Sequence, residues 1–251
     1  MCSFFSLVSN GKGKPYYFDW ELRKKILSKE LDYDADSHTS IADYHGFKGE
    51  KEDSLNKYEY NPLTRKFVKD QINTSDDSEE IEKFCNKLDF KTIISPFLIK
   101  DIIHPLNLPE PKVTDIDIKL LKQWDSVWAS VWDSVWASVG ASVWDSVRDS
   151  VGDSVRDSVW DSVGDSVRDS VGASVRDSVR DSVGASVWVY ISSFFLLDEW
   201  KYIDHKKGEN PFQPCIGLWE MGLIPSFDGK MWRLHGGKDA KILYEIKKED
   251  L

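Results

Sequence analysis

The chain has few cysteines, and it has no long apolar run. Its 251 residues include only three cysteines, Cys2, Cys85 and Cys215, which lie far apart and form no CxxC pair. This spacing argues against a disulfide framework or a zinc knuckle and fits a reducing compartment. No window approaches the ~20 continuous apolar residues that a membrane helix needs. The segment Met1–Phe5 lacks the basic residues that begin a secretory signal. We therefore expect a cytoplasmic protein without a membrane span.

Basic charge is also scarce. The chain carries 33 Lys and Arg against 43 Asp and Glu, a formal net charge of −10. This balance argues against a nucleic-acid partner, because nucleic-acid binding depends on basic side chains that neutralise phosphates. Aromatic residues make up 13% and hydrophobic residues 41% of the chain, which excludes global disorder.

A tandem tetrapeptide repeat of the form X-Z-Ser-Val occupies residues 124–187. Sixteen copies follow one another without insertion; Ser and Val never vary, Z is Asp or Ala, and X is Trp, Arg or Gly. The three residue types found at X share almost no chemistry, and their codons differ by single first-base changes. The variation therefore fits drift at a tolerant, solvent-facing position, and a selected recognition surface is the alternative.

The constant valines are accordingly expected to form the repeat core, and the X residues a variable surface. The expected core is Val127, Val131, Val135, Val139, Val143, Val147, Val151, Val155, Val159, Val163, Val167, Val171, Val175, Val179, Val183 and Val187. The expected surface is Trp128, Trp132, Trp136, Trp144, Arg148, Arg156, Trp160, Arg168, Arg176 and Arg180.

Two conformations suit a period of four. On an α-helix each copy advances by ~400°, and Asp at Z pairs with Arg three residues later, as in Asp165 and Arg168. This favours a long helix or a helical hairpin. The alternative is a small β-solenoid with a corner in every copy, because Gly, Asp and Ser are turn residues. That alternative resembles the pentapeptide-repeat proteins, although each side would be one residue shorter.

The flanks predict small α+β modules. Residues 1–104 combine aromatic, β-prone runs with amphipathic helical spacing, as over 74–88. In this region Asn61-Pro62-Leu63-Thr64 predicts a hairpin turn, residues 37–44 predict a short helix, and residues 90–94 and 97–103 predict strands. A Pro-rich linker follows at 105–113, and a helix is expected to enter and leave the repeat over 114–199. Residues 200–251 predict a compact C-terminal module with a short hairpin around His235-Gly236-Gly237. The expected fold is thus α+β ends that flank a central repeat segment.

Four stretches carry a resemblance. They are Met1–Trp20, Asp36–Gly46, Tyr58–Thr74 and Asn210–Gly237. Together with the X-(Asp/Ala)-Ser-Val tract, they are similar to a group of predicted viral and environmental proteins that carry tetrapeptide repeats. The resemblance implies a viral or phage-like source and implies no activity.

Few residues predict chemistry. Cys2 follows Met1 and resembles the N-terminal nucleophile of glutamine amidotransferases, but Ser3-Phe4-Phe5 departs from the glycine expected there. His38 and His45 stand in an Asp/His-rich stretch that suggests a metal, but seven residues of helix would hold them apart. Neither a P-loop nor GxGxxG occurs, so no cofactor is expected.

These observations favour a non-enzymatic structural or interaction protein. Its extendable repeat would serve as a spacer, an oligomerisation stalk or a variable binding surface, with a protein partner or self-association. One alternative is an enzyme with an N-terminal nucleophile within residues 1–104. The other is an acidic mimic of nucleic acid, because the repeat is rich in aspartate.

Overall fold

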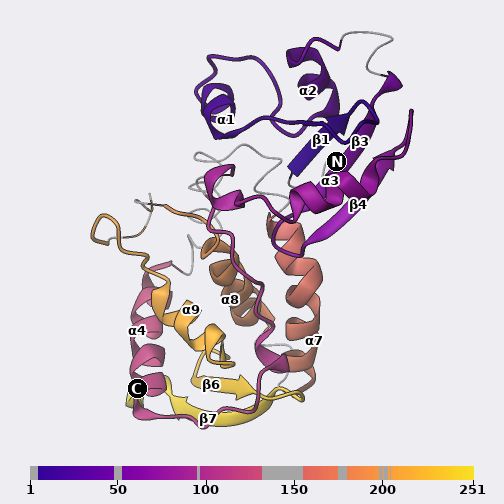
Figure 1. Ribbon diagram of the computed structural model, residues 1–251. Helices are drawn as coiled ribbons and strands as arrows, with labels where there is room; N and C mark the ends of the chain where they lie inside the picture. The colour runs from indigo at the N-terminus through magenta and orange to yellow at the C-terminus, as the bar shows by residue number, and fades with distance from the viewer. Residues whose placement is uncertain are drawn as a thin grey trace. The chain divides into compact units, whose positions relative to one another are not determined.

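The structure, a computed structural model, describes residues 5–47, 53–94, 97–131, 155–174, 180–197, 200, 203 and 205–251. The chain divides into two compact units, whose elements are labelled in Figure 1. Unit 1 contains Met1–Asp101 and Val147–Val155, and unit 2 contains Ile102–Ser146 and Arg156–Leu251.

Unit 1 is built on a four-stranded antiparallel sheet with the order β2-β1-β3-β4. The strands are β1 (Phe5–Ser9), β2 (Pro15–Tyr16), β3 (Asn56–Asn61) and β4 (Lys66–Gln71). Leu7 lies opposite Tyr58 and Phe5 opposite Tyr60, so one sheet face carries these buried apolar side chains. The hairpin expected around Asn61-Pro62-Leu63-Thr64 is confirmed by the pairing of β3 with β4.

Helices complete unit 1. They are α1 (Trp20–Leu27), α2 (His38–Tyr44), α3 (Ser78–Cys85) and the 3-10 turn η2 (Phe90–Thr92). Asp19 caps α1 by accepting from the backbone N–H of Leu22, and Ser37 caps α2 by accepting from that of Ser40. An apolar cluster beneath α1 and α2 contains Val8, Phe18, Ile26, Ile41, Ala42 and Leu55.

A buried ion pair joins α1 to the segment before α2. The guanidinium of Arg23 donates to both carboxylate oxygens of Asp36 at 2.6 and 3.2 Å, and both side chains are 4% exposed. Asp36 also accepts from the backbone N–H of Ser6 in β1 at 3.4 Å. The pair therefore fixes this segment against the sheet through interactions that burial shields from water.

Unit 2 combines helices with a three-stranded antiparallel sheet of order β5-β6-β7. Its elements are η3 (Pro105–Asn107), α4 (Asp115–Val131), η4 (Trp160–Gly164), α7 (Asp165–Ser174), α8 (Arg180–Ser192), α9 (Gln213–Glu220), β5 (Ile224–Phe227), β6 (Met231–Gly236), β7 (Lys241–Lys247) and η6 (Lys248–Asp250). The hairpin expected around His235-Gly236-Gly237 is confirmed as β6 and β7. In Figure 1, α4 and α9 lie side by side, and α9 also contacts α8.

The core of unit 2 mixes repeat residues with residues that follow the repeat. It contains Leu121, Trp124, Trp128, Ala185, Val189, Trp200, Ile203, Phe212, Cys215, Ile216, Leu218, Leu223, Trp232 and Leu234. Trp128 packs edge-on against Trp124 and Trp232 at centroid distances of 5.6 and 5.9 Å. The indole N–H of Trp232 donates to Asp125 at 2.8 Å. The first two copies of the repeat are therefore part of this core.

Every described residue of the repeat is helical, since residues 124–131, 155–174 and 180–187 all lie in helical segments. The repeat length equals the four-residue step of an α-helical hydrogen bond, so equivalent positions of successive copies are joined. The hydroxyl of Ser162 donates to the carbonyl of Ser158 at 2.6 Å, and that of Ser186 to the carbonyl of Ser182 at 3.0 Å. The constant serine thus satisfies its hydroxyl within its own helix.

The turn η4 is π-helical. In an α-helix, four residues rotate about the helix axis by ~40° more than a full turn. In a π-helix, with ~4.4 residues per turn, four residues rotate by ~30° less than a full turn. One π turn therefore offsets much of the drift of the valine stripe. Consistent with this, Val159, Val163, Val167 and Val171 are all at most 1% exposed.

The expected architecture is wrong. The structure is a mixed α/β fold with two small antiparallel sheets, and its described part contains neither one long central helix nor a β-solenoid. A single 64-residue helix would be ~96 Å long and would expose its valine and tryptophan stripe. Here α7 and α8 pack against each other, and α8 packs against α9 and β5, which buries that stripe. The solenoid is overturned because no described repeat residue lies in a strand.

Candidate functional site

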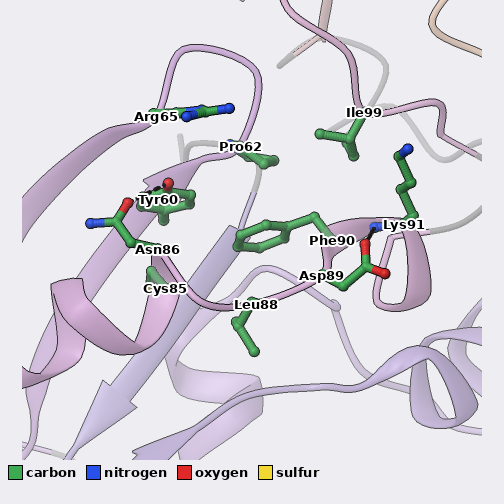
Figure 2. Close-up of a pocket in the computed structure, with 10 residues that line it drawn as sticks. All are labelled: Tyr60, Pro62, Arg65, Cys85, Asn86, Leu88, Asp89, Phe90, Lys91 and Ile99. Carbon is green, nitrogen blue, oxygen red and sulfur yellow. Dashed lines mark hydrogen bonds between the residues drawn. The ribbon is translucent and has the colours of Figure 1, made fainter.

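A pocket of about 370 Å³ lies in unit 1 between the β3–β4 turn, the end of α3 and η2 (Figure 2). It is lined by Tyr60, Pro62, Arg65, Cys85, Asn86, Leu88, Asp89, Phe90, Lys91 and Ile99. Its size is at the lower end of small-molecule sites and suits one or two side chains of a peptide.

Stacked aromatic rings form the apolar wall of the pocket. The rings of Tyr60 and Phe90 lie 5.3 Å apart at an interplanar angle of 11°. The hydroxyl of Tyr60 donates to the side-chain oxygen of Asn86 at 2.8 Å, which fixes the tyrosine ring at the end of α3. Burial raises the pKa of Tyr60 above its usual value and that of the neighbouring Cys85 to about 12. Cys85 is therefore a protonated thiol at neutral pH and a poor nucleophile.

Two cationic side chains stand at the rim. Arg65 ends the β3–β4 turn with a φ of 55°, and its side chain is 74% exposed. The turn is held by Asn61, whose side chain accepts from the N–H groups of Leu63 and Thr64 at 3.0 and 3.2 Å. Lys91 is exposed on η2, which Asp89 caps through the N–H of Lys91 at 3.1 Å.

The charges around the pocket do not balance fully. Arg65 reaches the carboxylate of Asp101 only at 3.8 Å, with both side chains mostly exposed. Such a pair contributes little in water. One carboxylate oxygen of Asp89 accepts from the backbone N–H of Lys91 in its own helical turn. Arg65, whose pair with Asp101 is weak, and the exposed Lys91 can therefore attract a carboxylate held against the aromatic wall.

A second polar centre in unit 1 is structural. Asp77 accepts hydrogen bonds from the Ser9 hydroxyl, the Gly13 N–H at 2.8 Å, the Asn56 amide at 2.9 Å and the Tyr58 hydroxyl at 2.7 Å. Burial by itself would raise the pKa of the Asp77 carboxyl, but these four donors outweigh it and lower the pKa. Burial of the Tyr58 hydroxyl and its hydrogen bond to the Asp77 carboxylate raise the pKa of Tyr58.

The two histidines of the Asp/His-rich stretch, His38 and His45, do not share a site. The Nε2 atom of His38 lies 3.0 Å from the carbonyl oxygen of Tyr58, and that of His45 lies 3.2 Å from the carbonyl oxygen of Tyr17. His38 instead forms a group with Glu59 and Asp70, whose ligand atoms all lie within 4.8 Å of one another. Among the described residues, these three are the group with metal-ligand spacing.

Of the other two cysteines, the structure describes one. Cys2 lies outside the described residues. Cys215 is fully buried in the core of unit 2, and burial raises its pKa to about 12.

The structure buries most of the described valines of the repeat. Val155, Val159, Val163, Val167, Val171, Val183 and Val187 are buried, and Val127 is partly buried. The side chains of Val131, Val135, Val139, Val143, Val147, Val151, Val175 and Val179 lie outside the described residues.

The X position is less uniform than expected. Arg156, Trp160 and Arg168 are partly exposed, but Trp128 is 4% exposed because α9 and the β5-β6-β7 sheet cover this end of α4. Trp128 therefore corrects the expectation of a solvent-facing position. The side chains of Trp132, Trp136, Trp144, Arg148, Arg176 and Arg180 are outside the described residues.

Trp160 and Arg168 belong to a small surface cluster. The expected pair of Asp165 with Arg168 is confirmed at 2.8 Å. The indole N–H of Trp160 also donates to Asp165 at 3.1 Å, and the guanidinium of Arg168 lies 5.6 Å from the centre of the Trp160 ring. Arg156 pairs with its neighbour Asp157 at 2.9 Å.

His235 occupies a buried polar site in unit 2. Its Nδ1 atom lies 3.1 Å from the carbonyl oxygen of Ala240 and its Nε2 atom 2.7 Å from the hydroxyl of Ser226. Because a carbonyl only accepts, Nδ1 carries the proton and Nε2 accepts from Ser226. Burial lowers the pKa of His235 to about 4, and both side chains are inaccessible, so this pair holds β5 to β6.

The pocket residues were not singled out by the sequence. The turn Asn61-Pro62-Leu63-Thr64 predicts a hairpin and hence the placement of Arg65, but no spacing pattern links Tyr60 to Phe90 or Lys91. Their juxtaposition depends on how α3 and η2 fold back onto β3.

The described helices include none long and apolar enough to cross a membrane. Comparison with known proteins finds no matching family model, no matching curated protein and no matching solved structure.

Proposed function

We propose that the protein is a non-enzymatic interaction protein, and that the pocket of unit 1 binds an acidic, apolar segment of a protein chain. The observation that carries this proposal is the pairing of a stacked aromatic wall, Tyr60 on Phe90, with two cations at its rim, Arg65 and Lys91. An aromatic wall binds an apolar side chain, and the cations bind a carboxylate beside it.

The repeat itself has the chemistry that this pocket requires. Each X-Asp-Ser-Val copy places a carboxylate between X and a valine, and X is Trp in four of these eleven copies. The sixteen copies contain eleven aspartates against five arginines, so the repeat as a whole is attracted to a cationic rim. We therefore propose that the pocket takes a repeat segment of a second copy of the chain, and that the protein self-associates through it.

Sedimentation equilibrium of the full chain over a range of concentrations tests this proposal. We expect concentration-dependent self-association that weakens at high salt, because exposed charges are screened. The double substitution Arg65→Ala/Lys91→Ala should weaken the association by tenfold or more. Lys87→Ala is the matched control, because Lys87 is exposed on the same connection between α3 and η2 but does not line the pocket.

A peptide probe separates the role of the repeat from that of other surfaces. A labelled peptide of residues 132–147 should bind the full chain, and the same peptide with Asp133→Asn and Asp145→Asn should bind much more weakly. Self-association that persists unchanged in the Arg65→Ala/Lys91→Ala variant would overturn the proposal. A full chain that remains monomeric and does not bind the peptide would also overturn the proposal.

A further inference from the structure

Three potential ligands from three elements of unit 1 converge on one point. His38 is the first residue of α2, Glu59 lies in β3 and Asp70 lies in β4, and one ligand atom of each falls within 4.8 Å of the others. The chain separates them by 21 and 11 residues, so only the fold brings them together.

The imidazole of His38 is oriented for ligation. Its Nε2 atom faces the carbonyl oxygen of Tyr58 at 3.0 Å, and a carbonyl only accepts, so Nε2 carries a proton. In the neutral ring this leaves the lone pair on Nδ1, which lies 3.6 Å from Oδ2 of Asp70. A second-shell carbonyl that fixes the tautomer and the ring plane is a common feature of metal-binding histidines. The His38 side chain is only 8% exposed, so this orientation is held by packing.

A β-bulge directs Asp70 toward His38. Along β3 and β4, Tyr58 pairs with Lys69, but the next pair joins Lys57 to Gln71, so the register passes over Asp70. A bulged residue leaves the ladder and its side chain is re-aimed. Glu59 pairs with Val68, two residues before Asp70, and the two carboxylates lie close to each other on this hairpin.

The distances suit a small cation better than a direct hydrogen bond. The 3.6 Å between Nδ1 of His38 and Oδ2 of Asp70 exceeds ordinary hydrogen-bond length. Two ligands of a tetrahedral zinc ion with bonds of ~2.0 Å lie ~3.3 Å apart. A small inward movement of the carboxylates is therefore enough to close the site around an ion.

We propose that His38, Glu59 and Asp70 bind a divalent transition-metal ion of the zinc class. An imidazole ligand favours such ions over Mg²⁺ and Ca²⁺, which prefer all-oxygen sites. Three protein ligands leave the fourth position to water. The Asp70 side chain is 51% exposed, which gives the ion access from solvent. The site is separate from the pocket lined by Arg65 and Lys91, and it does not depend on the interaction function proposed above.

Isothermal titration of the chelator-treated full chain with Zn²⁺ tests the site, with Co²⁺ absorption as a report on geometry. We expect saturable binding of one ion per chain and Co²⁺ bands of tetrahedral type. Asp70→Asn and Glu59→Gln should each weaken binding about tenfold or more. Glu79→Gln is the matched control, because Glu79 is an exposed carboxylate of unit 1 that lies outside the group.

His38→Gln should abolish binding, but the loss of a buried ring also affects folding, so the two carboxylate variants decide the question. Their fold is checked by circular dichroism. Affinity that is unchanged in both would overturn the proposal. Absence of saturable Zn²⁺ binding to the wild-type chain would overturn it equally.

Discussion

The indole of Trp160 lies directly over the α-carbon of Gly164, one repeat copy further along the chain. A β-carbon added to Gly164 would stand 2.8 Å from Cδ2 and 3.0 Å from Cγ of Trp160, closer than such atoms approach. The two residues are the X positions of successive copies within the π turn η4. The residue types at these two positions are therefore coupled. They do not vary independently, as drift at a tolerant position would predict.

This coupling predicts opposite effects for two glycines of the repeat. Gly164→Ala should destabilise the protein by about 1–3 kcal/mol, the usual cost of overpacking. Gly172→Ala should stabilise it by up to about 1 kcal/mol, because nothing lies within 4 Å of its added methyl and alanine favours the helix. Urea unfolding measures both. If Gly164→Ala were as favourable as Gly172→Ala, the contact with Trp160 would not constrain the repeat.

Val159 and Trp160 predict a contrast between the two kinds of repeat position. Val159 is fully buried, so Val159→Asp should cost several kcal/mol through an unpaired buried charge. Trp160→Arg should cost about 1 kcal/mol, since the ring is partly exposed and loses its contacts with Asp165 and Arg168. Chemical denaturation compares the two variants. A larger loss at Trp160 would show that the tryptophan, and not the valine, anchors this helix.

His235 predicts acid sensitivity of unit 2. Its pKa is about 4 in the folded protein and ~6.5 when unfolded, so the unfolded state binds the proton more readily. The stability that this histidine contributes is complete above pH ~6.5 and is lost as the pH falls toward 4. Between pH 7.5 and 5 the loss is about 2 kcal/mol. The His235→Gln variant should start less stable at pH 7.5 but should lack this part of the acid-induced loss. Parallel pH profiles for the two proteins would refute the assignment.

The Arg23–Asp36 pair predicts strong coupling in a double-mutant cycle. Arg23→Met or Asp36→Leu alone should destabilise unit 1 by about 3–5 kcal/mol, because each leaves a buried charge without its partner. The double variant should cost much less than the sum. The free energies of unfolding of the three variants and the wild type close the cycle. Additive effects would mean that the two side chains act independently.

Local features could be predicted from the sequence with some success. The hairpins at 56–71 and 231–247 follow from turn residues between β-prone runs, and Ser37 was recognisable as the start of a short helix. The strand expected at 90–94 did not form, because Asp89 caps the 3-10 turn η2 there instead, and residues 97–103 form no strand either. A local hydrogen bond there outweighs the β-propensity of the apolar residues.

The candidate sites could not be predicted in the same way. The pocket needs Tyr60 and Phe90, and the proposed metal site needs His38, Glu59 and Asp70. These residues are distant in sequence, and Asp70 reaches its position through a bulge that has no clear sequence signal. The sequence places His38 and His45 in one Asp/His-rich stretch, but the Nε2 atom of His45 lies near the carbonyl oxygen of Tyr17, away from Glu59 and Asp70.

The sequence by itself determined the repeat, its acidic charge and the separation of constant from variable positions. It also determined that a four-residue period agrees with the helical hydrogen-bond step, as the bond from Ser162 to Ser158 shows. Only the tertiary structure decided that the helical segments pack together rather than extend as one rod, because a lone helix leaves its apolar stripe in water. Packing likewise decided that Trp128 is buried while Trp160 is partly exposed. Burial depends on which surface covers a helix, and Trp128 and Trp160 are the same residue type at the same position of the repeat.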